Sequence, residues 1–280
     1  MLDNLSTGKL DNLAGHLNNE KVHFVKGDIR NAELVEKLVG EVDYIVHSAA
    51  LISVPFSIEK PMVTTEVNFN GTLNLLKASV NSNIERFIFI SSCAVYGEAR
   101  YLPIDEGHPP SPLSPYAASK LAAENYCTAF HNTYCLKTVI LRLFNVYGPR
   151  QDFNQYSGVI TQFRQRIRKK LPPVIFGDGT QTRDFIHVSD VTEAISKALE
   201  APRVDGETFN IGSGTAIKIA ELAKLMLRLA SLDLSIEYDA PRPGDIKNSY
   251  ADIAKAGKLL NFKPKISLSA GLEALLKADA

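Results

Sequence analysis

The sequence predicts an α/β fold in which a doubly wound, parallel sheet is covered by helices on both faces. Short, nearly continuous apolar runs alternate with segments of helical periodicity through the first 149 residues. Such a rhythm is typical of parallel strands that are buried on both sides. With 280 residues, of which 45% are hydrophobic, the chain is also long enough to bury a sizeable core.

The expected elements follow one another as strand and helix in turn. Strands are predicted over residues 22–25, 44–47, 87–90 and 139–143, and helices over about 31–39, 61–80 and 116–134. Ligands of such sheets bind beyond the carboxyl ends of the strands, so function is expected directly after each one. Those positions are Gly27-Asp28, Ser48-Ala49-Ala50, Ser91-Ser92 and Phe144-Asn145.

The rhythm changes after Pro149. Short strands and helices then mix with turn signals at 172–173, 177–179, 212–214 and 241–244. We therefore expect residues 150–280 to form a smaller lobe that is interleaved with the end of the sheet.

The overall composition excludes several classes of protein. The 31 basic and 31 acidic residues cancel, which gives no reason to expect a nucleic-acid or membrane-surface partner. Only three cysteines occur, without a C-x-x-C pair, which argues against a disulfide framework and for a reducing compartment. No metal site is predicted. No apolar run approaches a membrane span, and the first residues lack a secretory signal. A cytoplasmic protein is predicted.

The most informative local pattern is Tyr116-Ala117-Ala118-Ser119-Lys120. On a helix, Tyr116 and Lys120 lie on one face. A phenol has an unperturbed pKa of about 10, and a nearby ammonium favours the phenolate, so Tyr116 can serve as a base. The alternative is an exposed helix with an incidental pair. The preceding strand ends in a serine pair, and Ser92 can supply a neighbouring hydroxyl, so we interpret the pattern as catalytic.

Three motifs in order resemble the extended short-chain dehydrogenase/reductase family, and within it most closely the UDP-glucose 4-epimerases. They are SSCAVYG at 91–97, SPYAASK at 114–120 and LRLFNVYGP at 141–149, with further matches at 177–179, 183–188 and 242–245. The resemblance covers nearly the whole chain. It implies a Rossmann-like, NAD-binding domain over residues 1–149 and a mainly substrate-binding lobe over residues 150–280.

The resemblance also implies a role for each matching residue. Tyr116 would be the catalytic base, Lys120 would bind the nicotinamide ribose, and Ser92 would hydrogen-bond the 4-oxygen of the sugar. The remaining contacts to NAD would come from Asp3, Asn4, Asp28, Ile29, Ser48, Ala49, Ala50, Asn68 and Phe144. The UDP-sugar would also meet Asn145, Arg183, Arg242, Asp245 and Ser249.

These roles agree with the chemistry of the side chains. A carboxylate accepts both ribose hydroxyls, and an arginine binds phosphate through two parallel hydrogen bonds. Two of the residues have a purely structural alternative. Asn68 could be an ordinary polar residue of a helix face, and Arg183 could pair with Asp184 or Asp190.

The implied reaction is a redox cycle at C4 of a UDP-hexose, in which NAD is regenerated. A nucleotide-sugar 4,6-dehydratase is the nearest relative, but it carries Asp-Glu where this chain has Cys93-Ala94. The small Ser249 leaves room for an N-acetyl group, so UDP-N-acetylglucosamine is an expected substrate beside UDP-glucose. The resemblance is also compatible with a homodimer.

The family's opening strand, its glycine-rich G-x-x-G-x-x-G loop and the helix that follows have no counterpart in this sequence. That loop and helix N-terminus normally hold the pyrophosphate. Two explanations are compatible with the sequence: an upstream start, which makes this an epimerase gene with a shortened front, or a truncated relative that binds nucleotide sugar without catalysis. The first is expected.

Overall fold

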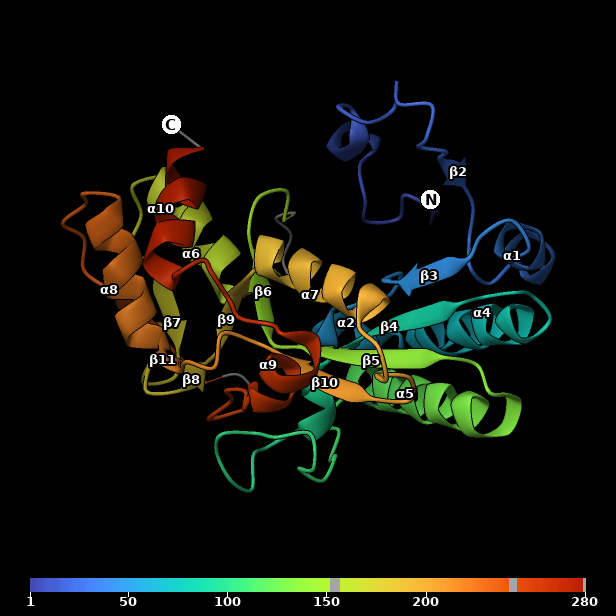
Figure 1. Ribbon diagram of the computed structural model, residues 1–280. Coiled ribbons are helices and arrows are strands. Elements are labelled where there is room, and N and C mark those ends of the chain that lie inside the picture. The colour runs from blue at the N-terminus through green and yellow to red at the C-terminus, as the bar shows by residue number, and fades with distance from the viewer. Residues whose placement is uncertain (152–156, 242–245, 279–280) are drawn as a thin grey trace. The chain divides into compact units, whose positions relative to one another are not determined.

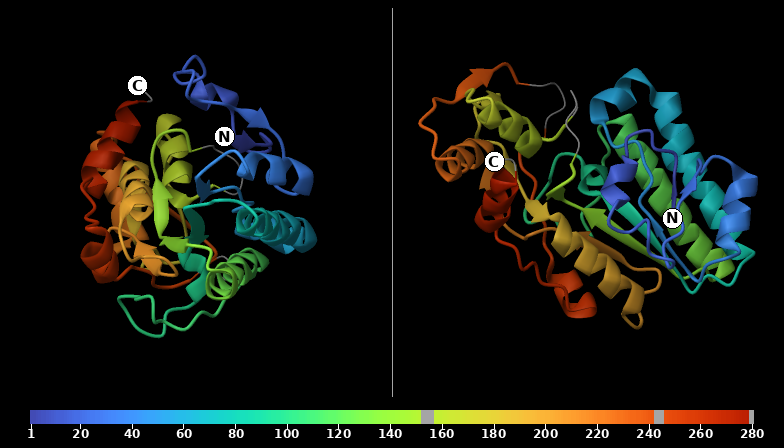
Figure 2. Two further views of the ribbon diagram at one scale, coloured as in Figure 1. Left: turned by 45° about the vertical axis from the view of Figure 1, so that its right-hand side comes forward. Right: turned by 90° about the horizontal axis from the view of Figure 1, so that it is seen from above.

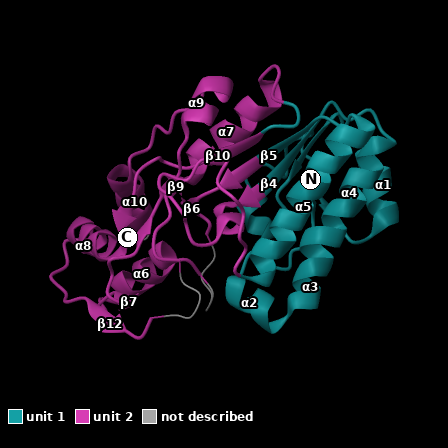
Figure 3. Cartoon of the chain, turned by 90° about the horizontal axis from the view of Figure 1, so that it is seen from below, with its two compact units in different colours: residues 1–90, 114–140, 205–207 teal, residues 91–113, 141–204, 208–280 magenta. Residues whose placement is uncertain are grey.

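The computed structural model describes residues 1–151, 157–241 and 246–278, and Figure 1 shows their arrangement along the chain. The chain divides into two compact units that alternate in sequence, as the two colours of Figure 3 show. Unit 1 comprises residues 1–90, 114–140 and 205–207, and unit 2 comprises residues 91–113, 141–204 and 208–280. The predicted NAD-binding domain (residues 1–149) and substrate-binding lobe (residues 150–280) are defined by the ligands they bind. The compactness of the two units does not test that prediction.

A four-stranded sheet with the order β10-β5-β4-β3 is the main sheet of the described chain. Its strands are β3 (Tyr44–His47), β4 (Arg86–Ser92), β5 (Thr138–Leu143) and β10 (Thr208–Ile211). Strand β3 runs parallel to β4, with Tyr44 opposite Arg86 and His47 opposite Phe89. The α/β fold with a parallel sheet is thus confirmed.

The helices of unit 1 lie along its strands. They are α1 (Ala32–Val39), α2 (Val54–Glu59), α3 (Pro61–Thr65), the π-helix η2 (Glu66–Asn70), α4 (Gly71–Val80) and α5 (Pro115–Tyr134). Helices α1, α4 and α5 run side by side in Figures 2 and 3. Side-chain caps fix the start of α1 and α5: the side chains of Asn31 and Ser114 accept hydrogen bonds from the backbone N–H groups of Leu34 and Ala117. A core that includes Phe87, Phe89, Leu76 and Ile140 packs beneath these helices.

Two predictions for unit 1 need correction. The strand expected over residues 22–25 is β2 (Val25–Lys26), because its register follows the two residues of β1 (Leu2–Asp3) that pair with it. The single helix expected over residues 61–80 contains the π-turn of η2, in which Gly71 donates to the carbonyl of Glu66. Helix α2 and the short 3-10 helix η1 (Leu10–Leu13) were not predicted.

Unit 2 contains short strand pairs and amphipathic helices around a second core. Strands β6 (Asn145–Tyr147) and β9 (Phe185–His187) pair in parallel, as do β7 (Val174–Phe176) and β12 (Glu237–Asp239). Strands β8 (Thr182–Arg183) and β11 (Ile217–Lys218) are antiparallel. The helical elements are η3 (Cys93–Tyr96), α6 (Val159–Arg168), α7 (Val188–Glu200), α8 (Ile219–Leu229), α9 (Ala254–Leu260) and α10 (Leu268–Lys277). The core includes Phe163, Ile175, Leu222 and Met226.

The last residue of β3, His47, is a polar group inside the core of unit 1. It is 3% exposed, and its ring lies against those of Phe87 and Phe89. Its Nε2 atom is 2.8 Å from Thr72 Oγ1. Burial, followed by the charge of Lys120, lowers the pKa of His47 to about 3, so the folded protein holds this imidazole neutral at neutral pH.

We predict that His47 makes the protein acid-sensitive. Its pKa in the unfolded chain is about 6.5, so below that pH the unfolded state binds a proton that the folded state does not bind until about pH 3. The free energy of unfolding, measured with urea, should therefore fall by up to about 1.4 kcal/mol per pH unit as the pH drops below about 6.5. His47→Gln should lose this component, and identical pH dependence in both proteins would contradict the prediction.

Candidate active site

The tyrosine and lysine of the predicted catalytic pair lie in the first two turns of α5. Pro115 occupies the first helical position, and the Ser114 hydroxyl accepts the N–H of Ala117 at 3.2 Å. Tyr116 and Lys120 are both buried, at 8% and 3% exposed. The cap therefore fixes where α5 begins, and with it the position of Tyr116 and Lys120 along the strands of the sheet.

The ammonium of Lys120 is anchored at the end of β4. Its Nζ atom donates to the carbonyl of Ile90 at 2.9 Å and lies 4.8 Å from the centre of the Phe89 ring. Burial lowers the pKa of Lys120 to about 8, while the nearby Cys127 and Glu124 act in the opposite direction. At neutral pH the group is therefore still a cation, held one helical turn from Tyr116.

Ser92 is the last residue of the same strand, two residues after Ile90. Its hydroxyl caps η3 by accepting the N–H of Ala94 at 3.2 Å. Ser92 belongs to unit 2, whereas Tyr116 and Lys120 belong to unit 1. The next residue, Cys93, is a thiol whose pKa burial raises to about 11, and its side chain hydrogen-bonds Ser249.

The residues predicted for the adenosine end of NAD converge at β1 and β2. Asn4 donates to Asp28 at 2.9 Å, and the N–H of Gly27 donates to the carbonyl of Asp3 at 3.1 Å. Sequence reasoning missed Arg30, which donates twice to Asp28 at 2.9 and 2.8 Å. Arg30 above all holds the pKa of Asp28 well below its usual range, so this partly exposed carboxylate is charged and oriented.

Ile29 and Asn68 are held in the interior of unit 1. The side chain of Ile29 packs where Gly71 leaves space: a Cβ atom on Gly71 would lie 2.4 Å from its Cδ1 atom. Asn68 lies in η2, is 1% exposed, and bonds the backbone of Leu51 and the hydroxyl of Ser119. The loop of Ser48, Ala49 and Ala50 directly precedes Leu51, so Asn68 is next to the predicted cofactor path.

In unit 2, three of the residues predicted for the substrate are hydrogen-bonded to the backbone of Thr182 or Asp184. Asn145 donates its N–H and its side-chain amide to the carbonyl of Asp184, at 3.0 and 3.1 Å. Arg183 donates to the carbonyl of Thr182 at 2.8 Å, and the N–H of Ser249 donates to the same carbonyl at 3.2 Å.

Phe144, another predicted contact, is buried at 2% exposed. Its N–H donates to the carbonyl of Ile211 at 2.9 Å, so its place is fixed by the β5–β10 side of the sheet. Arg242 and Asp245 lie outside the described residues. The structure thus brings Asn145, Arg183 and Ser249 into one neighbourhood of unit 2 and buries Phe144 at the end of β5.

A hollow of about 660 Å³ adjoins Arg183, which also donates to the carbonyl of Lys247 at 3.4 Å. It is lined by Phe176, Gly177, Asp178, Thr180, Gln181, Tyr238, Asp239, Pro241, Ile246 and Lys247. The two aromatic side chains, Phe176 and Tyr238, suit a planar ligand, while Asp178, Asp239 and Lys247 add charges of both signs. Sequence reasoning found turn signals at Gly177-Asp178-Gly179 and from Pro241 onward, but it did not bring these two parts of the chain, about sixty residues apart, into one hollow.

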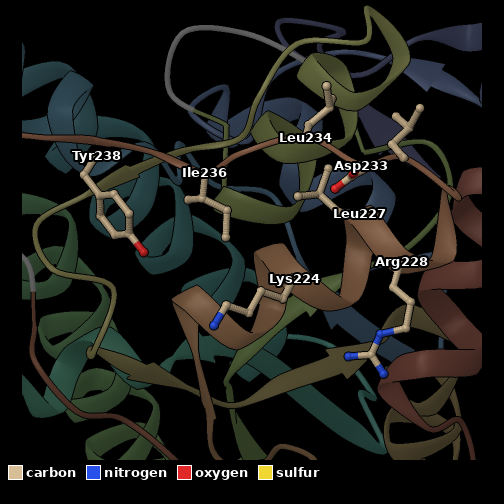
Figure 4. A pocket seen from close by; sticks show the side chains of 8 residues that line it. Lys224, Leu227, Arg228, Asp233, Leu234, Ile236 and Tyr238 are labelled. Atoms are coloured by element: carbon tan, nitrogen blue, oxygen red, sulfur yellow. The ribbon is translucent and has the colours of Figure 1, made fainter.

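Unit 2 has a second, smaller hollow between α8 and residues 232–238, and Figure 4 shows its side chains. Lys224 and Arg228 project from α8 beside the apolar Leu227, Leu234 and Ile236. None of the predicted site residues lines it. We assign it no part in the site.

The described residues contain no cluster of three side chains able to hold a metal ion. Within the same part of the chain, none of the helices combines the length and the apolar character needed to cross a membrane.

The NAD dependent epimerase/dehydratase family model matches residues 2–212. A putative UDP-glucose 4-epimerase of Methanocaldococcus jannaschii is 41% identical over 275 residues, covering 98% of this chain and 87% of that protein.

Two solved structures are also similar over 99% of this chain and 88% of theirs. The UDP-glucose 4-epimerase of Thermotoga maritima with UDP-glucose has a TM-score of 0.93 at 36% identity. The UDP-N-acetylglucosamine 4-epimerase of Methanobrevibacter ruminantium, in complex with UDP-N-acetylmuramic acid, has a TM-score of 0.94 at 39% identity. By both the family match and these relatives, the chain belongs to the NAD dependent epimerase/dehydratase family.

Proposed function

We propose that the protein is a UDP-hexose 4-epimerase that interconverts UDP-glucose and UDP-galactose with NAD. The observation that carries the proposal is the buried Tyr116–Lys120 pair, whose ammonium is anchored on the Ile90 carbonyl. A tyrosine beside a fixed cation is suited to take a proton from a sugar hydroxyl and to give it back.

The residues of unit 1 fit NAD. Asp3 and Asn4 suit the hydroxyls of an adenosine ribose, and the charged Asp28, oriented by Asn4 and Arg30, flanks the adenine together with Ile29. Ser48, Ala49 and Ala50 are small enough for a dinucleotide to approach the backbone after β3. When bound, NAD supplies a hydride acceptor and donor for C4 of the sugar.

The protein's own groups manage the proton. Tyr116 takes the proton of the 4-hydroxyl as C4 loses its hydride. The electron pair of the O–H bond then forms the second bond of the 4-keto group, and the electron pair of the C4–H bond leaves with the hydride. Lys120 keeps a positive charge beside the developing phenol, and Ser92 donates a hydrogen bond to the 4-oxygen. The proton then returns from Tyr116 when C4 regains its hydride from the other face.

In unit 2, Arg183 binds the diphosphate, and Arg242 and Asp245 are proposed to act with it. The aromatic hollow at Phe176 and Tyr238 takes the uracil end of the substrate. Asn145 and Phe144 border the sugar and the cofactor. The three cysteines are free thiols, which supports the proposal that the protein acts in the reducing environment of the cytoplasm. Assembly as a homodimer stays a prediction.

Cys93 argues against a 4,6-dehydratase. Dehydration needs an additional acid and base at the sugar, and the residues after Ser92 are a thiol and a methyl group. Because burial raises the pKa of Cys93 to about 11, this thiol stays protonated at neutral pH and cannot act as the base. A binding protein without catalysis is the remaining alternative, and the first experiment below decides between the two.

The first prediction is that the purified chain, given NAD and UDP-glucose, forms UDP-galactose until equilibrium, as chromatography of the nucleotide sugars would measure. Tyr116→Phe keeps the ring and removes the base, so the rate should fall by about 100-fold or more. Binding of UDP-glucose without any conversion would reject the epimerase and support the binding protein.

The second prediction concerns pH. Because the pKa of Lys120 is lowered to about 8, its cation is lost as the pH rises through that value, well before an ordinary lysine at about 10.5. The epimerisation rate should therefore decline above about pH 8. In Lys120→Met this decline should be absent and the rate low throughout. A wild-type profile that stays flat up to about pH 10 would contradict the role of Lys120.

The third prediction concerns the size of the sugar. Ser249 is small and 5% exposed, and we propose that it borders the 2-position of the sugar. Both UDP-glucose and UDP-N-acetylglucosamine should then be epimerised. Ser249→Tyr should lower kcat/KM for the acetylated sugar by at least about tenfold more than for UDP-glucose. Equal losses for both sugars would show that Ser249 does not select for size.

A further inference from the structure

The side chain of Asp184 is completely buried in unit 2, although a carboxylate is costly to remove from water. It lies between the short strands β8 and β9, directly after Arg183. Burial raises the pKa of Asp184, while hydrogen bonds from its neighbours act in the opposite direction. A buried carboxylate is stable only when hydrogen-bond donors surround it, so the segments that supply those donors show what this group holds together.

Four hydrogen bonds converge on the two oxygens of the Asp184 carboxylate. Oδ1 accepts the N–H of Ser213 at 2.7 Å and the hydroxyl of the same residue at 2.6 Å. Oδ2 accepts the N–H of Gly214 at 3.0 Å and that of Ala251 at 3.1 Å. The fit is close, because a Cβ atom on Gly212 would lie 2.6 Å from Oδ2. All four partners donate, which suits the ionised carboxylate because it has only acceptors.

The bond from Ala251 connects Asp184 to the residue that is proposed to border the sugar. Ala251 follows Ser249 by two residues, and the N–H of Ser249 donates to the carbonyl of Thr182 at 3.2 Å. This segment thus bonds residues 182 and 184 in turn, one on each side of Arg183. The two bonds together set where Ser249 lies relative to Arg183.

The backbone of Asp184 makes a further connection, to Asn145. The carbonyl of Asp184 accepts both the N–H of Asn145, at 3.0 Å, and its side-chain amide, at 3.1 Å. Asn145 begins β6, which pairs in parallel with β9 directly after Asp184. Asp184 is therefore next to Arg183 in the chain, bonded to Asn145, and bonded to the segment that carries Ser249.

Asp190 offers a comparison within the same unit. It is 2% exposed and accepts the N–H groups of Lys265 at 3.0 Å and Ile266 at 3.2 Å. These donors lie between α9 and α10, in a segment without any residue that is proposed to meet a ligand. Both buried aspartates join segments of unit 2, but of the two, Asp184 alone contacts the proposed substrate site.

We propose that Asp184 is a positioning residue of the substrate site. Its buried carboxylate fixes residue 184, and with it the arrangement of Arg183, Asn145 and Ser249 before the substrate binds. The inference rests on the function proposed above, because that function assigns these three residues to the diphosphate and the sugar. A preformed site binds its ligand more tightly than one that must be ordered on binding. Loss of the carboxylate should therefore weaken substrate binding, although Asp184 itself does not touch the substrate.

The arrangement is tested without ligand, by residue-resolved amide hydrogen exchange of the purified chain. In Asp184→Asn, one carboxylate oxygen becomes an NH2 group that cannot accept a hydrogen bond from the surrounding N–H groups. The amides of Asn145 and Ser249 should then exchange at least about tenfold faster than in the wild type. In the matched control Asp190→Asn, both amides should stay within about threefold of the wild type. Equal acceleration in the two variants, or none in Asp184→Asn, overturns the proposal.

Calorimetry then tests the consequence for binding. Tyr116→Phe serves as the background, because we expect it to bind UDP-glucose with little conversion. Adding Asp184→Asn should weaken the binding of UDP-glucose by about tenfold or more, and adding Asp190→Asn by less than about threefold. Both changes should lower the midpoint of thermal unfolding, since each leaves buried N–H groups poorly bonded. Equally weakened binding in the two double variants would reveal a general loss of folding and contradict a positioning role.

Ser213→Ala decides the matter if Asp184→Asn does not fold. In the same Tyr116→Phe background it removes only the hydroxyl at Oδ1 and should weaken UDP-glucose binding by about three- to fivefold. Its control is Ser267→Ala, which removes the hydroxyl that caps α10 and should leave binding unchanged. Unchanged binding in Ser213→Ala overturns the proposal. A background protein that does not bind UDP-glucose at all, with the exchange result intact, instead refutes the proposed function and leaves Asp184 as the group that orders these segments.

Discussion

The buried ammonium of Lys120 is the constraint around which unit 1 is organised. Removing a charge from water is costly unless it finds partners, and here those partners are the Ile90 carbonyl and the face of the Phe89 ring. Both residues belong to the second half of β4, so α5 has to cross the sheet beside that part of the strand. These partners do not fully offset the cost of burial, so the pKa of Lys120 is lowered to about 8. The group therefore loses its proton just above neutral pH.

Several polar residues of the interior lie near the end of β3. His47 closes β3, Thr72 and Asn68 link it to the helices, and the apolar core made by Phe87, Leu76 and Ile140 fills the space behind them. In unit 2 the buried Asp184 has a comparable role. It accepts the N–H groups of Ser213, Gly214 and Ala251, and so ties two other segments of the chain to the residue that follows Arg183. In both units, one fully bonded buried group orients the residues expected to meet ligands.

Local sequence signals were sufficient to predict the helices that begin at a capping residue and the strands that consist of an apolar run. Asn31 and Ser114 cap helices α1 and α5, and the apolar runs of β3, β4 and β5 appear close to where they were expected. The π-turn at Glu66–Asn70 was missed because the periodicity of residues 61–80 is helical throughout, and one inserted residue hardly disturbs it. Strand β2 was shifted because two residues of β1, and no local pattern, set its register.

The sequence by itself determined the family, the α/β class and the catalytic candidates Tyr116, Lys120 and Ser92, because their spacing along one helix and after one strand is a local property. Only the tertiary structure decided which groups hold them. The carbonyl under Lys120, the arginine that orients Asp28 and the amide that joins Leu51 to Ser119 come from residues far apart in the chain or without a distinctive pattern. Whether a hydrogen bond forms depends on differences of a few tenths of an ångström in the distance between donor and acceptor, and the packing of the folded chain sets that distance.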